Sequence, residues 1–436
     1  MYKNLKLSEQ KLNLIIFFSL IIIQLPWINI NGIAAPDTAG YLDVSRNWFN
    51  SDSIYIRPII YPIFIYLSNF YFSGPFGGII YIQIIFYALS GMLFYKILVQ
   101  QQLKINRILL FFLVILSFSA PQSLHMNQIV LPEIIPLFFL LLLFSFLLKP
   151  LSLKNSLIIS ALIITPILIK PLWLLLLSFP IIKFIYSKKN LNDFLYGLLI
   201  PILLSISIYS TNQYLVSKNN VNQIIASTFD VNINLALIRM GLIDGSQGTK
   251  LYKYLDNNGL IPEISNRSWT SNYDEYNSFN EIKKNIPWEY REDYLFWKNI
   301  LNKPTNLIKY SSFQFSRLPI FFATSAENGS VKFLFEPLNN IYQRFFSNIH
   351  SKHIAGIAFI SFTLIIGLFN FNKLSIHKLL FFLILEVSII LCLLTYQNAH
   401  FLRMRASIEP LIVYVTLVTF IKLLKFIHQK YNLTIK

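Results

Sequence analysis

Apolar runs of about the length needed to cross a lipid bilayer recur along the whole chain, and they constrain its fold more than any other feature. They lie at 12–30, 79–99, 107–120, 131–148, 155–169, 171–186, 194–215, 354–371, 379–396 and 406–427. A transmembrane helix needs about 20 mostly apolar residues. Hydrophobic residues make up 55% of the chain and charged residues 13%, whereas soluble domains carry roughly 25% charged residues. The sequence therefore predicts an all-α polytopic membrane protein with about ten transmembrane helices.

The positively charged residues are concentrated in every second connection between these runs. With the N-terminus in the cytoplasm and one crossing per run, the cytoplasmic connections hold basic clusters at 3–11, 183–189 and 422–436, but only Glu9 and Asp193 as acids. Cytoplasmic connections of membrane proteins carry an excess of Lys and Arg. The pattern accounts for most of the net charge of +17. It predicts a multi-pass integral membrane protein with both termini in the cytoplasm.

Two connections are too polar to lie in a membrane, and both fall on the external side of this topology. Residues 31–57 form the first external loop, and residues 216–350 form a much longer one with tryptophans and turn-forming pairs such as Asp244-Gly245. We therefore expect three parts: an N-terminal transmembrane core at 1–215 that carries loop 31–57, a large external subdomain at 216–350, and C-terminal transmembrane helices at 351–436.

Several chemistries are excluded by what the sequence lacks. Cys392 is the one cysteine and lies in an apolar run, so a disulfide framework or a Cys-based metal site cannot form within the chain. His350 and His353 are three residues apart, without a nearby carboxylate to complete a metal site. The sequence has no glycine loop typical of phosphate binding and no stripe of basic and aromatic residues, so we expect no nucleic acid partner.

Polar residues at the external ends of the predicted helices are the best candidates for chemistry, because ionisable groups at membrane depth are costly and usually functional. The densest group runs from Asp37 through Arg57 to Tyr61. Residues 38–50 have the apolar spacing of an amphipathic helix in the membrane interface, and Asp37 would stand at its N-terminus. A capping role and a catalytic role are both open for this aspartate.

A second group opens the last predicted helix, where His400, Arg403, Arg405 and Glu409 follow one another. Arginines on the external side run against the charge bias of the other connections. A guanidinium group offers paired donors that suit a phosphate. Snorkelling of the arginines to the membrane interface is the alternative.

Two further charged residues lie singly at external helix ends. Glu133 follows Leu131-Pro132 at the start of one predicted helix, and Lys170 lies between two apolar runs. Each could cap a helix or take part in a functional site. Glu386 falls in the middle of a predicted helix and has no assigned role.

Together these motifs resemble the GT-C superfamily of integral-membrane glycosyltransferases, and most closely its bacterial members similar to protein O-mannosyltransferases and lipid A aminoarabinose transferases. The likeness rests on an aspartate after the first helix, on Arg57-Pro58 and Tyr61-Pro62, and on Arg403-Met404-Arg405 and Glu409-Pro410 at the last helix. It covers the membrane portion of the chain. It implies a GT-C-like fold in the bacterial inner (plasma) membrane, with a periplasmic active site.

The resemblance also implies roles for individual residues. Asp37 would be the catalytic carboxylate, and Glu133 would be a second acid near the acceptor or a metal. Substrate binding, with the cations contacting the donor phosphate, would fall to Arg57, Tyr61, Lys170, His400, Arg403 and Arg405. Many relatives carry a second acid beside the loop aspartate, whereas Thr38 follows Asp37 here. A divalent cation (Mg²⁺ or Mn²⁺) is therefore an open alternative and not a predicted cofactor.

The implied reaction is the transfer of a monosaccharide from a polyprenyl-phosphate sugar to a lipid, glycan or protein acceptor, with inversion at the anomeric carbon. It needs a base within hydrogen-bond reach of the acceptor and cations beside the leaving phosphate, in a protein surrounded by membrane lipids. A polysaccharide polymerase or ligase that uses a polyprenyl-pyrophosphate glycan is one alternative. A transporter or flippase is another, which would favour inverted repeats and charges at the membrane midplane.

Overall fold

The computed structural model describes most of the predicted helices. The described residues are 9–25, 32–34, 37–48, 58–71, 76–101, 106–187, 190–218, 297–316, 374–394 and 405–434, with short pieces at 233–234, 236–238, 240–243, 253 and 256–257. Within these ranges the chain is mainly helical, and extended pairing is limited to one isolated parallel bridge between Ile33 and Ile129. The predicted run at 354–371 and most of the predicted subdomain at 216–350 lie outside the described residues.

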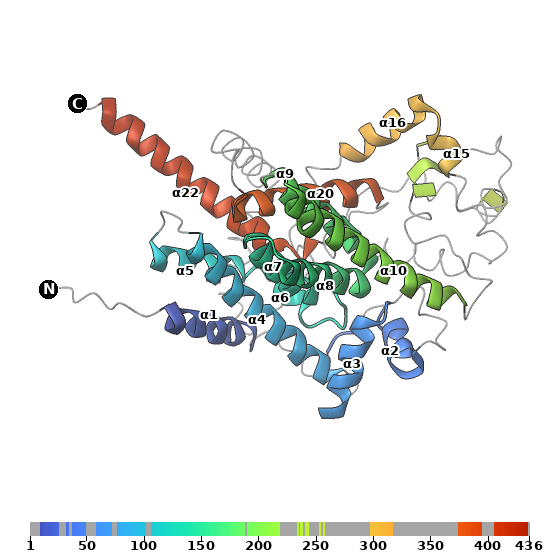
Figure 1. Cartoon of the computed structure of the whole chain (residues 1–436), viewed down its shortest axis with the longest axis horizontal. Helices are drawn as coiled ribbons and strands as arrows, with labels where there is room; N and C mark the ends of the chain where they lie inside the picture. The colour runs from blue at the N-terminus through green and yellow to red at the C-terminus, as the bar shows by residue number, and fades with distance from the viewer. Residues whose placement is uncertain are drawn as a thin grey trace. The chain divides into compact units, whose positions relative to one another are not determined.

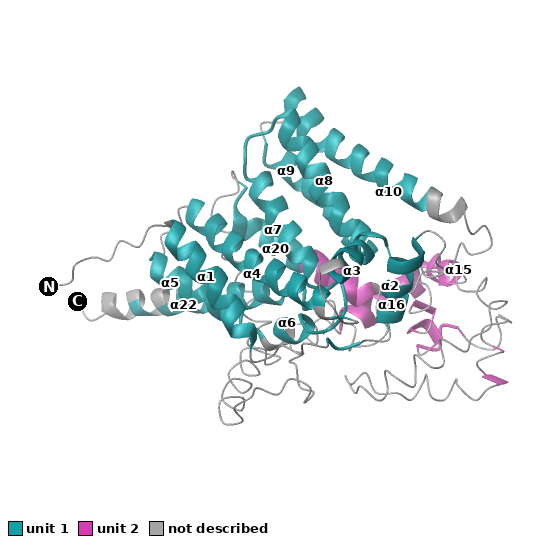
Figure 2. Ribbon diagram, turned by 90° about the horizontal axis from the view of Figure 1, so that it is seen from below, with its two compact units in different colours: residues 1–219, 325–384, 406–436 teal, residues 220–324, 385–405 magenta. Residues whose placement is uncertain are grey.

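The chain divides into two compact units, coloured separately in Figure 2. The first contains residues 1–219, 325–384 and 406–436, and the second contains residues 220–324 and 385–405. The division by function into 1–215, 216–350 and 351–436 stays a prediction.

The described helices of the first unit include most of those that the apolar runs predict, together with the shorter α2, α3 and α6 (Figure 1). In chain order they are α1 (Glu9–Gln24), α2 (Thr38–Asn47), α3 (Ile60–Tyr71), α4 (Gly77–Gln100), α5 (Arg107–Ser117), α6 (Pro121–Met126), α7 (Ile135–Leu147), α8 (Leu153–Ile169), the 3-10 helix η3 (Pro171–Leu177), α9 (Ser178–Ile185), the π-helical segment η4 (Asp193–Leu199), α10 (Ile200–Lys218) and α22 (Glu409–Thr434). Helix α20 (Ile376–Leu394) begins in the first unit and ends in the second.

Three stretches of the described chain are helical for long enough, and apolar enough, to cross a membrane. They are Gly78–Gln100 in α4, Asp193–Tyr214 in η4 and α10, and Ile376–Leu393 in α20. Shorter apolar helices of 10–17 residues accompany them. The described part of the chain is therefore that of an all-α membrane protein, as predicted.

Local sequence explains where several helices begin and end. The side chain of Asn106 accepts a hydrogen bond from the backbone N–H of Ile108 (2.8 Å) and caps α5. Ser152 does the same for Asn155 (3.2 Å) at the start of α8, which satisfies an otherwise unpaired helix N–H. Helix α8 ends before Lys170-Pro171, because the residue that precedes a proline avoids helical geometry.

The helices of the first unit pack as a row of neighbours. Helix α1 contacts α4, α4 contacts α7, α7 contacts α8, and α8 contacts α10, while α22 packs on α5. Two glycines allow close approach around α4. A Cβ on Gly78 would come within 2.7 Å of the Ser68 carbonyl oxygen in α3, and one on Gly91 would come within 2.2 Å of Leu20 Cδ1 in α1.

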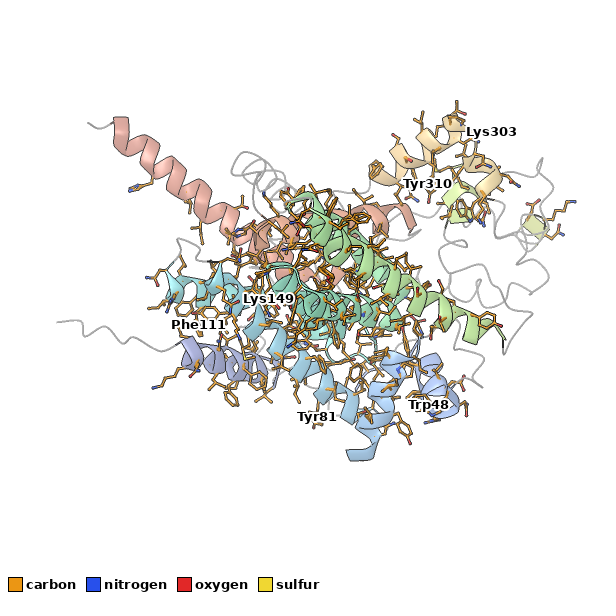
Figure 3. The ribbon with its side chains drawn as sticks, in the orientation of Figure 1. Trp48, Tyr81, Phe111, Lys149, Lys303 and Tyr310 are labelled. Atoms are coloured by element: carbon orange, nitrogen blue, oxygen red, sulfur yellow. The ribbon has the colours of Figure 1, made fainter. Side chains whose placement is uncertain are left out.

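The second unit contains two short helices, α15 (Trp297–Leu301) and α16 (Pro304–Phe315). Pro304 opens α16, a position where its missing N–H costs nothing. Tyr310, labelled in Figure 3, donates its hydroxyl to the carbonyl oxygen of Leu393 (2.6 Å) at the end of α20 and accepts a bond from Gln314 Nε2 (2.9 Å). These bonds join α16 to the end of α20 within this unit.

Candidate functional site

A short irregular segment, residues 127–134, connects α6 to α7 and lies buried among the helices of the first unit. Val130 and Ile134 are fully buried, and Glu133 is nearly so. Irregular backbone in a membrane protein is tolerated where other parts of the protein satisfy its polar groups. We call this stretch the buried segment 127–134. Most of the predicted site residues that the structure describes are attached to it.

The chain after α1 pairs with this segment. The backbone N–H of Ile33 donates to the carbonyl oxygen of Gln128 (2.9 Å), and the N–H of Val130 donates to the carbonyl oxygen of Ile33 (3.0 Å). Gly32 makes the approach feasible, because its φ of +66° lies in the left-handed region and a Cβ there would come within 2.9 Å of Phe76 Cβ. The start of the predicted external loop is therefore fixed to the segment by backbone bonds.

Helix α2 confirms the predicted amphipathic helix and places Asp37 next to the same segment. Tyr41, Val44 and Thr38 form the buried face of α2. The Thr38 hydroxyl donates to the carbonyl oxygen of Val130 (3.1 Å). Asp37 precedes α2 directly, is only partly buried, and does not cap the helix with its side chain. The backbone at Asp37 therefore lies next to the residue that bonds the buried segment 127–134, and the Asp37 side chain does not cap α2.

An amide side chain in α4 links the segment to α3. Gln83 is fully buried, and its Nε2 donates to the carbonyl oxygens of Asn127 (2.9 Å) and Ile129 (3.0 Å). Its Oε1 accepts a bond from the Tyr61 hydroxyl (2.8 Å). Tyr61 is itself fully buried, and its ring meets that of Tyr41 edge to face at 5.0 Å. Tyr61 therefore holds α2, α3 and α4 together through its ring and its hydroxyl.

The end of α1 joins this network through a second amide pair. Asn127 Nδ2 donates to Gln24 Oε1 (2.7 Å), and Gln24 Nε2 donates to the carbonyl oxygen of Leu20 (2.8 Å). Both amide side chains are buried. These bonds hold the buried segment against the C-terminus of α1 and the first third of α4.

Glu133 and Lys170, two separately predicted site residues, form an ion pair. Lys170 Nζ lies 2.9 Å from Glu133 Oε1. The side chains are 14% and 1% exposed, respectively, so the pair is largely shielded from solvent. Lys170 ends α8, while Glu133 belongs to the buried segment. Desolvation makes such a pair costly unless other polar groups support it, and the Ser407 hydroxyl donates to the backbone carbonyl of Glu133.

The turn that leads into α22 closes the site. The Ser123 hydroxyl donates to the carbonyl oxygen of Ala406 (3.0 Å), next to the bond from Ser407 to the Glu133 carbonyl. Glu409, the first residue of α22, is 1% exposed. The hydroxyl groups of Ser123 and Ser407 thus attach the start of the last helix to residues 123–133.

Four further predicted site residues are Arg57, His400, Arg403 and Arg405. Arg405 is fully buried, and it is grouped with the second unit while Ala406, the next residue, is grouped with the first. Arg57, His400 and Arg403 lie outside the described residues. The site described here therefore consists of Asp37, Tyr61, Glu133 and Lys170, all within the first unit.

One histidine near the buried segment has a shifted pKa. Burial lowers the pKa of His125, in α6, from 6.5 to about 4. His125 is therefore neutral at physiological pH. The Lys170 ammonium supplies the positive charge beside Glu133.

The described residues around Glu133 form no evident divalent-cation site. Among the described residues there is no group of three His, Cys, Asp or Glu side chains that could hold a metal ion. Glu133 already faces an ammonium group at 2.9 Å, and a Mg²⁺ ion would have to compete with it.

Several residues of the site were not anticipated from sequence. Gln83 and Gln24 are amides inside or at the end of apolar runs, and Asn127 and Ser407 flank proposed site residues. Buried polar side chains in apolar helices must find partners, so the isolated glutamine in the 79–99 run was the available signal. No protein-family model, curated protein or solved structure matches this chain.

Proposed function

We propose that this chain is a multi-pass glycosyltransferase of the GT-C kind, with about ten transmembrane helices, in the bacterial inner membrane. It would transfer a monosaccharide from a polyprenyl-phosphate sugar to a lipid, glycan or protein acceptor on the external face. The observation that carries the proposal is that Thr38, next to Asp37, bonds the buried segment that holds Glu133, and that Lys170 pairs with Glu133. These residues come from three distant parts of the sequence.

The proposed chemistry follows from the environments of these groups. Asp37 is partly exposed and does not cap α2, so its carboxylate suits a general base that takes the proton of the acceptor hydroxyl or amine. The acceptor oxygen or nitrogen then forms the bond to the anomeric carbon as the bond to the phosphate oxygen breaks. Attack from the side opposite the phosphate inverts the anomeric configuration. Lys170 would offset the charge on the leaving polyprenyl phosphate.

The alternation of helix directions supports the proposed topology. The C-terminal ends of α1 and α8 and the N-terminal ends of α7 and α22 all reach the buried segment 127–134 or its neighbours. Helices that cross a membrane in alternate directions bring such ends to one side. With the basic connections at the other ends, the positive-inside rule favours an external site and cytoplasmic termini.

The test compares the wild type with Asp37→Asn in a transfer assay in liposomes, with a labelled polyprenyl-phosphate sugar as the donor. Native mass spectrometry of the wild type in mild detergent first identifies the co-purified lipid and so the sugar to use. We expect Asp37→Asn to lower transfer by at least 100-fold, because a general base contributes 10²–10⁴-fold. Asp43→Asn is the matched control, since Asp43 lies in α2 and bonds Asn47 (2.6 Å).

The outcomes separate the candidate functions. Transfer by Asp37→Asn at the wild-type rate, with the protein folded, removes Asp37 from catalysis. A co-purified polyprenyl-pyrophosphate oligosaccharide would instead favour a polymerase or ligase. Loss of transfer in both Asp37→Asn and Asp43→Asn would indicate damage to α2 and not to the chemistry.

A further inference from the structure

Three lysines gather at the ends of the helices that point away from the buried segment 127–134. Lys149 follows α7, Lys183 lies in the last turn of α9, and Lys378 lies in the first turn of α20. All three belong to the first unit. We call them the lysine cluster. It is separate from the candidate glycosyltransferase site, because α7 and α8 meet that site with their opposite ends.

Contacts between the elements bring these lysines together. Lys183 Nζ donates to the backbone carbonyl of Lys149 (3.1 Å), so its ammonium sits at the C-terminal end of α7, where the helix dipole favours a cation. Lys378 Nζ lies 4.3 Å from the centre of the Tyr186 ring, and Tyr186 ends α9 three residues after Lys183. Each lysine is therefore tied to the end of α7 or α9.

The positions of the ammonium groups are fixed by specific contacts. The Lys149 ammonium folds back over the Phe146 ring at 3.7 Å (Lys149 is labelled in Figure 3). An ammonium group has three donors, and the bond to the Lys149 carbonyl uses one of those of Lys183. Asp193 acts electrostatically on Lys183 and supplies one negative charge against three positive ones. The cluster keeps a net positive charge.

Exposed apolar side chains lie on the helices that carry these lysines, and on α9 they occupy the side opposite Lys183, because residues two apart on a helix do not share a face. Ile181 and Ile185 of α9 are 46% and 57% exposed, and Leu191, just before η4, is 71% exposed. The Phe184 and Phe194 rings meet edge to face and join α9 to η4. Cations at the helix ends, together with exposed aliphatic side chains on the outer side of the same helices, suit a molecule with an anionic head and hydrocarbon tails.

We propose that the lysine cluster binds the head group of an anionic phospholipid, whose acyl chains lie along Ile181, Ile185 and Leu191. The phosphate would accept hydrogen bonds from Lys149 and Lys183, while Lys378 adds a fixed positive charge behind Tyr186. Charge complementarity selects this occupant over a zwitterionic lipid, and a basic pocket between helix ends is a recurrent form of anionic lipid site. The proposal does not depend on the glycosyltransferase assignment.

The test measures lipid retention by native mass spectrometry after delipidation and titration with phosphatidylglycerol or phosphatidylcholine. We expect the full-length wild type to retain phosphatidylglycerol preferentially. Lys149→Gln with Lys183→Gln should weaken that retention roughly 30-fold, because a lysine near an anionic surface contributes about 1 kcal/mol, or about fivefold in affinity. Lys11→Gln with Lys96→Gln is the matched control, since both lysines are exposed and lie on other helices.

Other results would overturn the proposal. Equal retention of phosphatidylglycerol by the cluster variant and the wild type would remove the site, and equal weakening by the control pair would reduce it to bulk charge. Inorganic phosphate that displaces the lipid and raises the melting temperature as much would assign the cluster to a free anion. Lys149→Arg with Lys183→Arg controls for misfolding. This variant keeps both charges, so it should retain the lipid.

Discussion

The ion pair between Glu133 and Lys170 is the residue-scale feature on which the site depends most. Removal of one partner leaves the other charge buried, which costs about 3–5 kcal/mol, whereas replacing both by apolar groups of similar size is often neutral. We expect Lys170→Met to lower the unfolding free energy by that amount and Glu133→Leu with Lys170→Met to restore most of it. Denaturation in detergent, followed by tryptophan fluorescence, measures both.

Activity of the same two variants separates structure from chemistry. The stable double variant should remain inactive, because it lacks the cation proposed to meet the donor phosphate. A double variant that is both stable and fully active would show that the pair only supports the fold. A single variant Lys170→Met as stable as the wild type would contradict the burial of Glu133.

His125 gives a pH dependence whose sign follows from its burial. Its pKa is lowered from 6.5 to about 4 in the folded protein, so between these values the unfolded chain binds a proton that the folded chain does not. Stability from this group is therefore fully present above pH 6.5 and is lost as the pH falls towards 4. We expect the melting temperature of His125→Asn to fall less than that of the wild type between pH 7.5 and 4.5. Parallel curves for the two proteins would contradict this.

The residue scale also shows what sequence could and could not provide. Asp37, Glu133 and Lys170 stand out because charged residues are rare in apolar surroundings. Their pairing does not stand out, since 37 residues separate Glu133 from Lys170 and no local pattern joins them. Gln83 was missed for a related reason, because its partners are two backbone carbonyls and a tyrosine, which carry no signal of their own.

At the scale of elements, Gln83 holds α3, α4 and the buried segment 127–134 together. Gln83→Leu leaves two backbone carbonyls and the Tyr61 hydroxyl without these bonds, and each buried polar group so affected costs about 1–3 kcal/mol, less where membrane helices find other partners. We expect a loss of roughly 2–4 kcal/mol for Gln83→Leu and about 1 kcal/mol for Tyr61→Phe. Thermal unfolding of the two variants in one detergent is the measurement, and a larger effect from Tyr61→Phe would contradict it.

The elements themselves were largely predictable, because hydropathy fixes which segments become helices. The runs at 79–99 and 379–396 became α4 and α20 with small changes at their ends. The run at 171–186 became a 3-10 helix followed by α9, with Pro171 at its first position. The 194–215 run opens with a π-helical segment. Hydropathy reports burial and length, but not which backbone bonds a helix uses.

For the whole molecule, the charge pattern predicts that both termini lie on one side of the membrane. We expect cysteines introduced by Gln10→Cys and Thr434→Cys, in a Cys392→Ser background, to react with an impermeant maleimide only after the membrane is opened. Asn47→Cys, at the end of α2, should react in intact cells. Labelling of the two ends from opposite sides would refute an even number of crossings, and labelling of both ends in intact cells would reverse the orientation.

The buried segment 127–134 has a consequence for the order of events during synthesis. Gln24, Ile33 and Gln83 have already left the ribosome when the segment emerges, but Lys170 follows 37 residues after Glu133, and Ser407 comes 274 residues after it. At about 5–20 residues per second, Ser407 is synthesised roughly 15–55 s after Glu133. The bond between them cannot form before then. A product released before α22 would therefore lack the bond from Ser407 to the Glu133 carbonyl.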